Sequence, residues 1–308
     1  MSHPGEPGPG VGASASASAS ASASASASAS GLDHAGICTR DGPALWAAFE
    51  ALGFALTPVA RQSGRRTPDG PIEELATGNR CAMLRQGYVE LLAILDPARF
   101  DNGLGALVDR YPGMHILALT MGDVAGNLAR LRRGGLAIPG VAHLERPVDD
   151  PAGPRARFSR LPLPDAPEGR VQLIRHETPE LLWQERWLHH PNGAATLCGS
   201  ILVSAQPAES AVRLSRLAGQ ALEPDPVGGF ALPLPDGTRL RILPPEVLGE
   251  VLPGVVPPAL PFHAGLVLRT ADGNAAARRW LAGIAAEGPL GLCVPPERAG
   301  GVALVFAP

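Results

Sequence analysis

The sequence predicts an α+β fold in which repeated βαβββ modules form cupped mixed β-sheets with their helices outside. One observation is that the order strand, helix, strand, strand, strand recurs along the chain, with a period of roughly 60 to 80 residues. Another is that two of the repeats open alike, with Asp-His-Ala-Gly-Ile at 33–37 and Phe-His-Ala-Gly-Leu at 262–266. The third is the high content of glycine (37) and proline (33), which favours short strands and turns over long helices.

The first module is expected over residues 32–97. An apolar run from Leu32 opens it, and a helix over 43–52 follows, with Asp41 as its N-cap, Pro43 in its first turn and Gly53 at its end. Three extended runs come next, the last being Tyr88-Val89-Glu90-Leu91-Leu92-Ala93-Ile94. The polar, Gly- and Arg-rich stretch 61–71 predicts a mobile loop between the second and third strands.

The same order is expected three more times. The second module has strands at 115–120, 141–146, 155–161 and 170–175 and a helix from Asp123 to about residue 133, closed by two glycines. The third has strands at 197–204 and 238–243 and a helix at 208–217. The fourth, predicted to lack about one strand, has strands at 262–268 and 301–306 and a helix at 274–284.

Composition limits the domain organisation and the environment. The 308 residues allow two domains: a disordered Ala/Ser-rich tail (1–31) is expected to precede a module pair at 32–177, a connector at 178–192 and a second pair at 193–308. The net charge of −3 predicts no nucleic-acid binding, and no apolar run is long enough for a membrane span. Four widely spaced cysteines without a Cys-x-x-Cys pattern favour buried free thiols and a cytoplasmic location.

Glu90 is the most informative single residue. Alternate residues of a strand share a face, so Glu90 lies on one surface with Tyr88 and Leu92 in an otherwise apolar run. A buried carboxylate is costly unless it is paired or binds a metal. Glu90 is therefore expected to hold a metal ion or to meet an arginine such as Arg80, in which case it is structural.

Several short motifs resemble those of the vicinal oxygen chelate superfamily, in particular its bacterial glyoxalase-like branch. They are Leu-Asp-His at 32–34, Leu-Gly-Phe at 52–54, Thr-Gly-Asn at 77–79, Tyr-Val-Glu-Leu at 88–91 and His-Pro-Asn-Gly-Ala at 190–194. The resemblance implies a glyoxalase/dihydroxybiphenyl dioxygenase-like fold, in which paired modules surround a divalent metal with ligands from the first and fourth strands of each.

Carried over to this sequence, the resemblance implies His34, Glu90, His115 and Gln172 as metal ligands, with Glu90 also as catalytic base. Two imidazoles, a carboxylate and an amide would suit Fe, Mn, Ni or Zn. His176 shares a strand face with Gln172 and is an alternative for that position. Both His176 and His190 are expected to line the substrate site.

The implied function is a metal-dependent lyase, isomerase or dioxygenase that acts on a small molecule with vicinal oxygens. A non-catalytic protein that binds a small molecule or drug on the same scaffold is the alternative. The matching positions of the second pair, Cys198, Arg241, His263 and Ala303, are poor ligands apart from His263. This half is expected to be structural, to bind substrate, or to form a homodimer contact.

Overall fold

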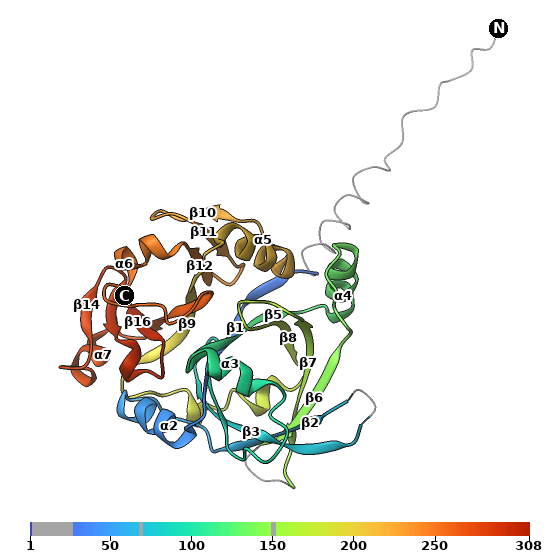
Figure 1. The fold of residues 1–308 in the computed structure, drawn as a ribbon, viewed down its shortest axis with the longest axis horizontal. Coiled ribbons are helices and arrows are strands. Elements are labelled where there is room, and N and C mark those ends of the chain that lie inside the picture. The colour runs from blue at the N-terminus through green and yellow to red at the C-terminus, as the bar shows by residue number, and fades with distance from the viewer. Residues whose placement is uncertain (2–26, 68–69, 149–151) are drawn as a thin grey trace.

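Two eight-stranded mixed sheets form the protein, as seen in a computed structural model that describes residues 1, 27–67, 70–148 and 152–308 (Figure 1). The first sheet has the order β2-β3-β4-β1-β5-β8-β7-β6, and the second has β10-β11-β12-β9-β13-β16-β15-β14. Each sheet combines two successive βαβββ modules, so the first module pairs with the second and the third with the fourth. The predicted α+β module architecture is confirmed.

The N-terminal sheet contains the first two modules (blue to green in Figure 1). Its strands are β1 (Ala29–Thr39), β2 (Ala60–Arg65), β3 (Ile72–Met83), β4 (Tyr88–Ile94), β5 (Gly113–Met121), β6 (Ala142–Pro147), β7 (Arg155–Leu163) and β8 (Arg170–His176), and its helices are α2 (Gly42–Ala51), α3 (Leu104–Arg110) and α4 (Val124–Arg133).

The C-terminal sheet contains the other two modules and lies beside the first (Figure 1). Its strands are β9 (Ala194–Val203), β10 (Glu223–Pro224), β11 (Phe230–Pro233), β12 (Arg239–Leu243), β13 (Phe262–Thr270), β14 (Ala286–Gly288), β15 (Gly291–Val294) and β16 (Ala303–Ala307), and its helices are α5 (Pro207–Ala218), α6 (Leu248–Val251) and α7 (Ala275–Trp280).

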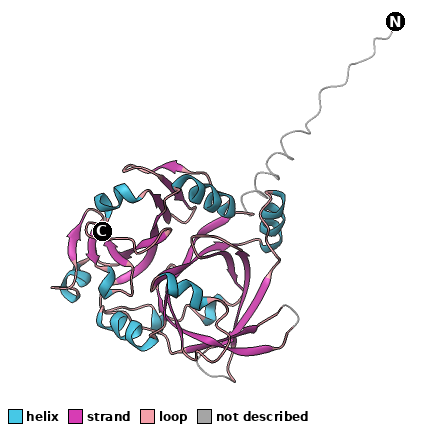
Figure 2. Cartoon of the chain, in the orientation of Figure 1, coloured by secondary structure: helices cyan, strands magenta, loops and turns pink. Residues whose placement is uncertain are grey.

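Local chemistry explains why α2 forms where the sequence predicts it, whereas α3 and α6 were not predicted. The Asp41 side chain accepts a hydrogen bond from the backbone N–H of Ala44 and caps α2, while Leu45 and Phe49 on its inner face are buried. Figure 2 shows α2, α4 and α5 at the periphery of the curved sheets, whereas α3 overlaps the N-terminal sheet in this view. The main apolar core spans both module pairs, since it includes Leu32 of β1 and Leu266 of β13.

Three expectations about segment boundaries are wrong. Residues 61–65 belong to strand β2, which pairs antiparallel with β3, instead of the predicted loop. The fourth module has all four strands, β13 to β16, because two very short strands complete it. Strand β1 begins at Ala29 and not at Leu32. The remainder of the predicted disordered tail, 2–26, lies outside the described residues.

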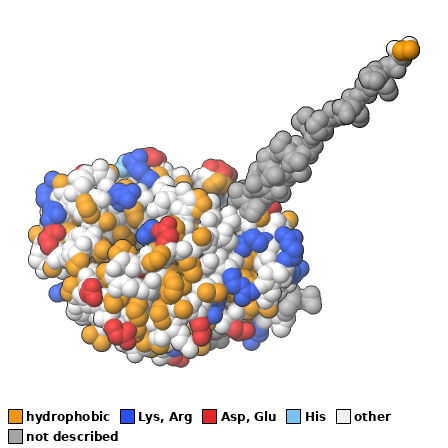
Figure 3. All heavy atoms as spheres, turned by 90° about the horizontal axis from the view of Figure 1, so that it is seen from above, with side chains coloured by type: hydrophobic (Ala, Val, Ile, Leu, Met, Phe, Trp, Pro, Cys, Tyr) orange, Lys and Arg blue, Asp and Glu red, His pale blue; other side chains and the backbone are white. Residues whose placement is uncertain are grey.

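The surface is mixed in charge on the face drawn in Figure 3, where arginine, acidic and hydrophobic side chains are interspersed. No helix in the described part of the chain is long and apolar enough to cross a membrane.

Candidate functional site

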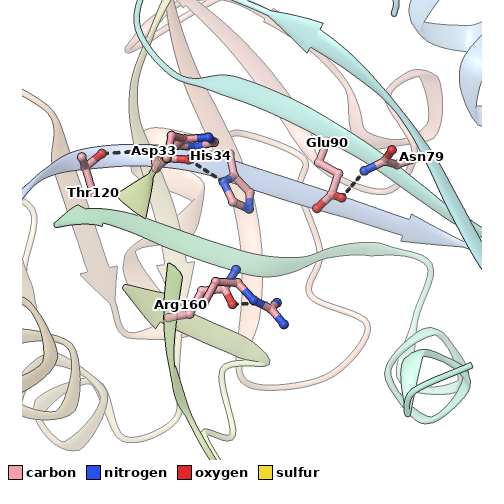
Figure 4. A network of polar contacts seen from close by, with 8 residues as sticks. Asp33, His34, Asn79, Glu90, Thr120 and Arg160 are labelled. Carbon is pink, nitrogen blue, oxygen red and sulfur yellow. Dashed lines mark hydrogen bonds and ion pairs between the residues drawn. The ribbon is translucent and has the colours of Figure 1, made fainter. Parts of the chain in front are cut away.

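The N-terminal sheet curves around a cavity of about 330 Å³. Strand pairing decides which side chains reach it. Gly36 of β1 lies opposite Glu90 in the parallel β1–β4 pair, and His34 lies two residues before Gly36, so His34 and Glu90 share a sheet face. Both side chains line the cavity, and both residues are more than nine-tenths buried. In Figure 4 they project from neighbouring strands into the same space.

His34 is held in one orientation by its sequence neighbour Asp33. The Nδ1 atom of His34 lies 2.7 Å from Asp33 Oδ1, and the imidazole stacks on Tyr88 with ring centroids 4.5 Å apart. This contact makes Nδ1–H the donor to Asp33 and leaves Nε2 directed away from that carboxylate. His34 therefore offers a base or a ligand atom at Nε2.

Asp33 also binds a second histidine. His176 Nε2 lies 3.0 Å from the same carboxylate oxygen. Burial alone raises the pKa of Asp33, but the hydrogen bonds from His176 and His34 outweigh it and hold the pKa well below its ordinary value. His176 is the predicted alternative for the position of Gln172. It binds Asp33 and so helps to hold that carboxylate against His34. It packs against Phe158 and Trp183 and is not among the side chains that line the cavity.

Among the residues that the structure describes, Glu90 meets side-chain amides and no arginine. Its Oε1 accepts a hydrogen bond from Asn79 Nδ2 on β3, with Gln62 Nε2 at 3.5 Å. Gln62 is fixed in turn by Thr77, whose hydroxyl donates to Gln62 Oε1 at 2.7 Å. Arg80, the arginine predicted as an alternative partner, instead binds the backbone carbonyl of Thr57 and the Glu50 side chain. Asn79 is the last residue of the Thr-Gly-Asn motif at 77–79. The structure shows that this asparagine orients Glu90.

The second module contributes Gln172 and an arginine that the sequence analysis missed. Gln172 of β8 lines the cavity, and its Oε1 accepts a hydrogen bond from Arg160 Nη1 of β7 at 3.1 Å. Figure 4 shows Arg160 across the cavity from His34 and Glu90. A single arginine in the polar strand 155–163 carries no sequence signal that would separate it from a surface residue.

The structure does not bring His115 to this cavity. Ala118 of β5 lies opposite His34 and Ile116 lies opposite Gly36, so Ala118 and Ile116 share the cavity face and His115 points to the other side. There His115 is fully buried, with Nε2 at 2.7 Å from the Tyr111 carbonyl oxygen and its ring stacked on that tyrosine. Because strands have a period of two, a one-residue offset reverses the face.

His190 has a structural position. Its Nδ1 accepts a hydrogen bond from the backbone N–H of Ala55 at 3.0 Å, and its Nε2 donates to the Met83 carbonyl oxygen at 2.8 Å. Both ring nitrogens are therefore occupied, and the residue is not among those that line the cavity. It connects the chain after 188 to the first module.

The residues present do not fit the four-ligand metal site of the superfamily. His34 Nε2 and Glu90 are suitable donors, but Ile116 faces the cavity where the second module would supply its imidazole. The Gln172 oxygen is already bound by the Arg160 guanidinium, whose positive charge repels a cation. Among the described residues, no group of three His, Cys, Asp or Glu side chains is arranged to hold a metal ion.

The cavity walls combine apolar surface with positive charge. Four arginines (Arg65, Arg146, Arg160 and Arg170) and two glutamates (Glu90 and Glu145) line it. Glu145 pairs with Arg155 outside the cavity lining, at 2.7 Å. Leu92, Ile116 and Ile174 are among the apolar lining residues. Small-molecule sites have this character, with an apolar wall, a few placed polar groups and volumes of roughly 300–1,000 Å³.

Comparison with known proteins supports the fold assignment. A hypothetical protein from Staphylococcus aureus superposes with a TM-score of 0.64 at 13% identity, covering 90% of this chain and 98% of that one. The Mn(II)-bound glyoxalase from Novosphingobium aromaticivorans gives a TM-score of 0.53 at 13% identity, covering 90% and 81%. A fusion of a xylose isomerase-like TIM barrel and 4-hydroxyphenylpyruvate dioxygenase gives 0.50 at 16% identity, covering 85% and 40%.

No curated protein matches the sequence. The family model described as a glyoxalase-like domain matches residues 32–218, which is more than half of the chain and includes every residue of the cavity. The chain therefore belongs to the glyoxalase-like domain family, within the vicinal oxygen chelate superfamily.

Proposed function

We propose that the cavity of the N-terminal sheet binds a small organic molecule with adjacent oxygens. The protein would then transfer a proton to or from this ligand without a resident metal. The observation that carries the proposal is that His34 and Glu90 line the same cavity, with Asp33 fixing the tautomer of His34. An imidazole whose Nδ1–H is bound to a buried carboxylate is a suitable general base at Nε2, and it can return the proton as an acid once Nε2 has taken it up. The first step is transfer of a proton between the ligand and His34 Nε2.

Each polar group has a distinct task in this proposal. Asp33 stabilises the imidazolium that forms when His34 takes up a proton, since it is a carboxylate 2.7 Å from Nδ1. Glu90, oriented by Asn79, faces the ligand from the neighbouring strand and accepts a hydrogen bond from a ligand hydroxyl. The apolar residues of the wall exclude water, which strengthens both interactions.

A test of this function uses proton exchange on the ligand. Small diols, ketones and carboxylic acids are incubated with the protein in D₂O, and loss of a C–H signal is followed by proton NMR. We expect exchange that depends on His34 and falls at least 100-fold in His34→Gln. His189→Gln is the matched control, because His189 is exposed and pairs with Glu185. Binding without exchange would instead support the non-catalytic binding protein.

A metal-dependent enzyme is the second candidate, and one observation favours it. In metal-bound histidines the N–H of the ring nitrogen away from the metal usually donates a hydrogen bond to a carboxylate. The Nδ1–H of His34 donates to Asp33 in the same way. In that case His34 and Glu90 would hold the ion, with Gln172 as a third donor only once Arg160 is displaced from its oxygen, and the ion would supply polarisation of the ligand oxygens. Elemental analysis of the purified protein decides between the two. One equivalent of Mn, Fe, Ni or Zn that is lost in Glu90→Ala would contradict the metal-free proposal.

A further inference from the structure

Arg160 lines the cavity and has an N–H group without a hydrogen-bond acceptor in the described part of the chain. Its Nη1 donates to Gln172, while its buried Nε has no hydrogen-bond partner among the described residues. No carboxylate of the described chain lies within ion-pair distance of its guanidinium. The charge of Arg160 is therefore left without a counter-charge in direct contact.

Two other partly buried arginines of this protein form ion pairs with buried carboxylates. Arg241 Nη2 lies 2.6 Å from Asp225 Oδ1, and Arg213 Nε lies 3.1 Å from Glu168 Oε2, where both carboxylates are almost fully buried. Arg160 differs from these two arginines: burial and the nearby Arg170 lower the pKa of its guanidinium, and the more distant charge of Glu90 only partly opposes them. A charge that is removed from water without a partner destabilises the fold. A bound anion would supply the missing partner.

We propose that Arg160 anchors a carboxylate group of the ligand, so that this cavity selects small organic carboxylates. The inference rests on the proposed ligand-binding role of the cavity and names the substrate class. The donors of Arg160 without a partner, Nε and Nη2, are neighbours on the guanidinium, and two adjacent N–H groups match the two oxygens of a carboxylate. The carboxylate would lie in the space that Arg160 shares with His34 and Glu90 (Figure 4).

A carboxylate fits this cavity better than a phosphate. Glu90 lies in the same cavity and repels a dianion more than a monoanion. The neighbouring walls are aliphatic or aromatic, with Leu92, Ile116 and Phe158 among them. These walls suit an apolar body attached to a single charged group.

The test compares acids with their uncharged amides. Titration calorimetry with benzoate, benzamide, phenylacetate and phenylacetamide measures how strongly the protein prefers a carboxylate over an amide of the same shape. We expect the acids to bind about 10–100-fold more tightly, which is the range that charge-assisted hydrogen bonds give. In Arg160→Met this ratio should fall to about one. In Arg160→Lys it should be intermediate, because lysine keeps the positive charge but lacks the two adjacent N–H donors of a guanidinium.

Arg157→Met is the matched control, since Arg157 is an exposed arginine on the same strand and does not line the cavity. It should keep the preference for acids. Thermal unfolding of each variant verifies that it is folded, and Arg160→Lys provides the result if Arg160→Met does not fold. Equal binding of acids and amides, an unchanged ratio in the folded Arg160 variant, or tighter binding of inorganic phosphate would overturn the inference.

These outcomes are separate from failure of the proposed function. Amides that bind as well as acids and still undergo proton exchange would remove the carboxylate anchor and leave the proton-transfer role. Acids that bind through Arg160 without any exchange would keep the anchor and remove that role. Binding of neither member of either pair would overturn the carboxylate anchor, while the proton-transfer role would still be decided by the exchange assay with diols and ketones.

Discussion

Replacing Asp33 by asparagine removes one negative charge from the centre of the polar network while keeping the side-chain shape. Asp33 Oδ1 receives hydrogen bonds from His34 Nδ1 at 2.7 Å and His176 Nε2 at 3.0 Å, and its side chain is 4% exposed. An amide oxygen still accepts both bonds but without the charge. The depressed pKa of Asp33 indicates that the fold favours the ionised form in spite of burial.

The size of the effect follows from the two bonds. Hydrogen bonds to charged groups contribute about 1.5–3 kcal/mol and neutral ones about 0.5–1.5 kcal/mol, so each bond loses about 1 kcal/mol. We therefore expect Asp33→Asn to lower the free energy of unfolding by about 2 kcal/mol at pH 7. Because the folded pKa lies below the unfolded value of about 3.9, this contribution is complete above pH 4 and decreases below it.

Urea unfolding followed by tryptophan fluorescence measures the difference at pH 7 and at lower pH. Asp109→Asn is the control, because Asp109 forms an exposed ion pair with Arg40 and its loss should cost less than about 0.5 kcal/mol. An Asp33→Asn deficit as small as that of the control would refute the conclusion that Asp33 organises the two histidines as a charged acceptor.

Three further predictions concern stability at other positions. His263 is buried and its pKa is lowered to about 4 by burial, so it binds a proton more readily in the unfolded chain. The unfolding free energy should therefore fall by roughly 3 kcal/mol as pH drops from 6.5 to 4, and His263→Gln should show a smaller pH dependence in the same urea assay. Phe49→Ala in α2 removes a fully buried ring and should cost about 3–5 kcal/mol of unfolding free energy in urea. Asn79→Leu removes the Asn79 amide donor from Glu90 and should lower the free energy of unfolding in urea by about 1–3 kcal/mol. An unchanged stability would show that another donor, such as Gln62, satisfies Glu90.

The module order was predictable because its signals are local. The Asp41 cap, the alternation of β4 and the repeated His-Ala-Gly motif each depend on residues near one another in sequence. Strand β2 was missed since a strand that lines a polar cavity lacks the usual apolar alternation. Gln62, Ser63 and Arg65 of β2 all contribute to the lining.

The candidate site was only partly predictable, because it depends on register between distant strands. His34, Glu90 and Gln172 do line one cavity, whereas His115 faces away from it. A histidine at the head of a strand does not reveal which face it occupies, and a shift of one residue changes the answer. Whether His34, Glu90 and Gln172 bind a metal stays a prediction.

The second module adds positive charge to the cavity of the N-terminal sheet and supplies few metal ligands. Where two further ligands would approach an ion, the chain places the side chains of Ile116 and Gln172, with Arg160 bound to the latter. Under our proposals, a guanidinium fixed to β7 takes over the positive charge that an ion supplies in a metal-dependent enzyme. Arginine remains protonated at any physiological pH, so anion binding would not depend on metal supply. The proton-transfer step would still depend on pH, because it uses the imidazole of His34.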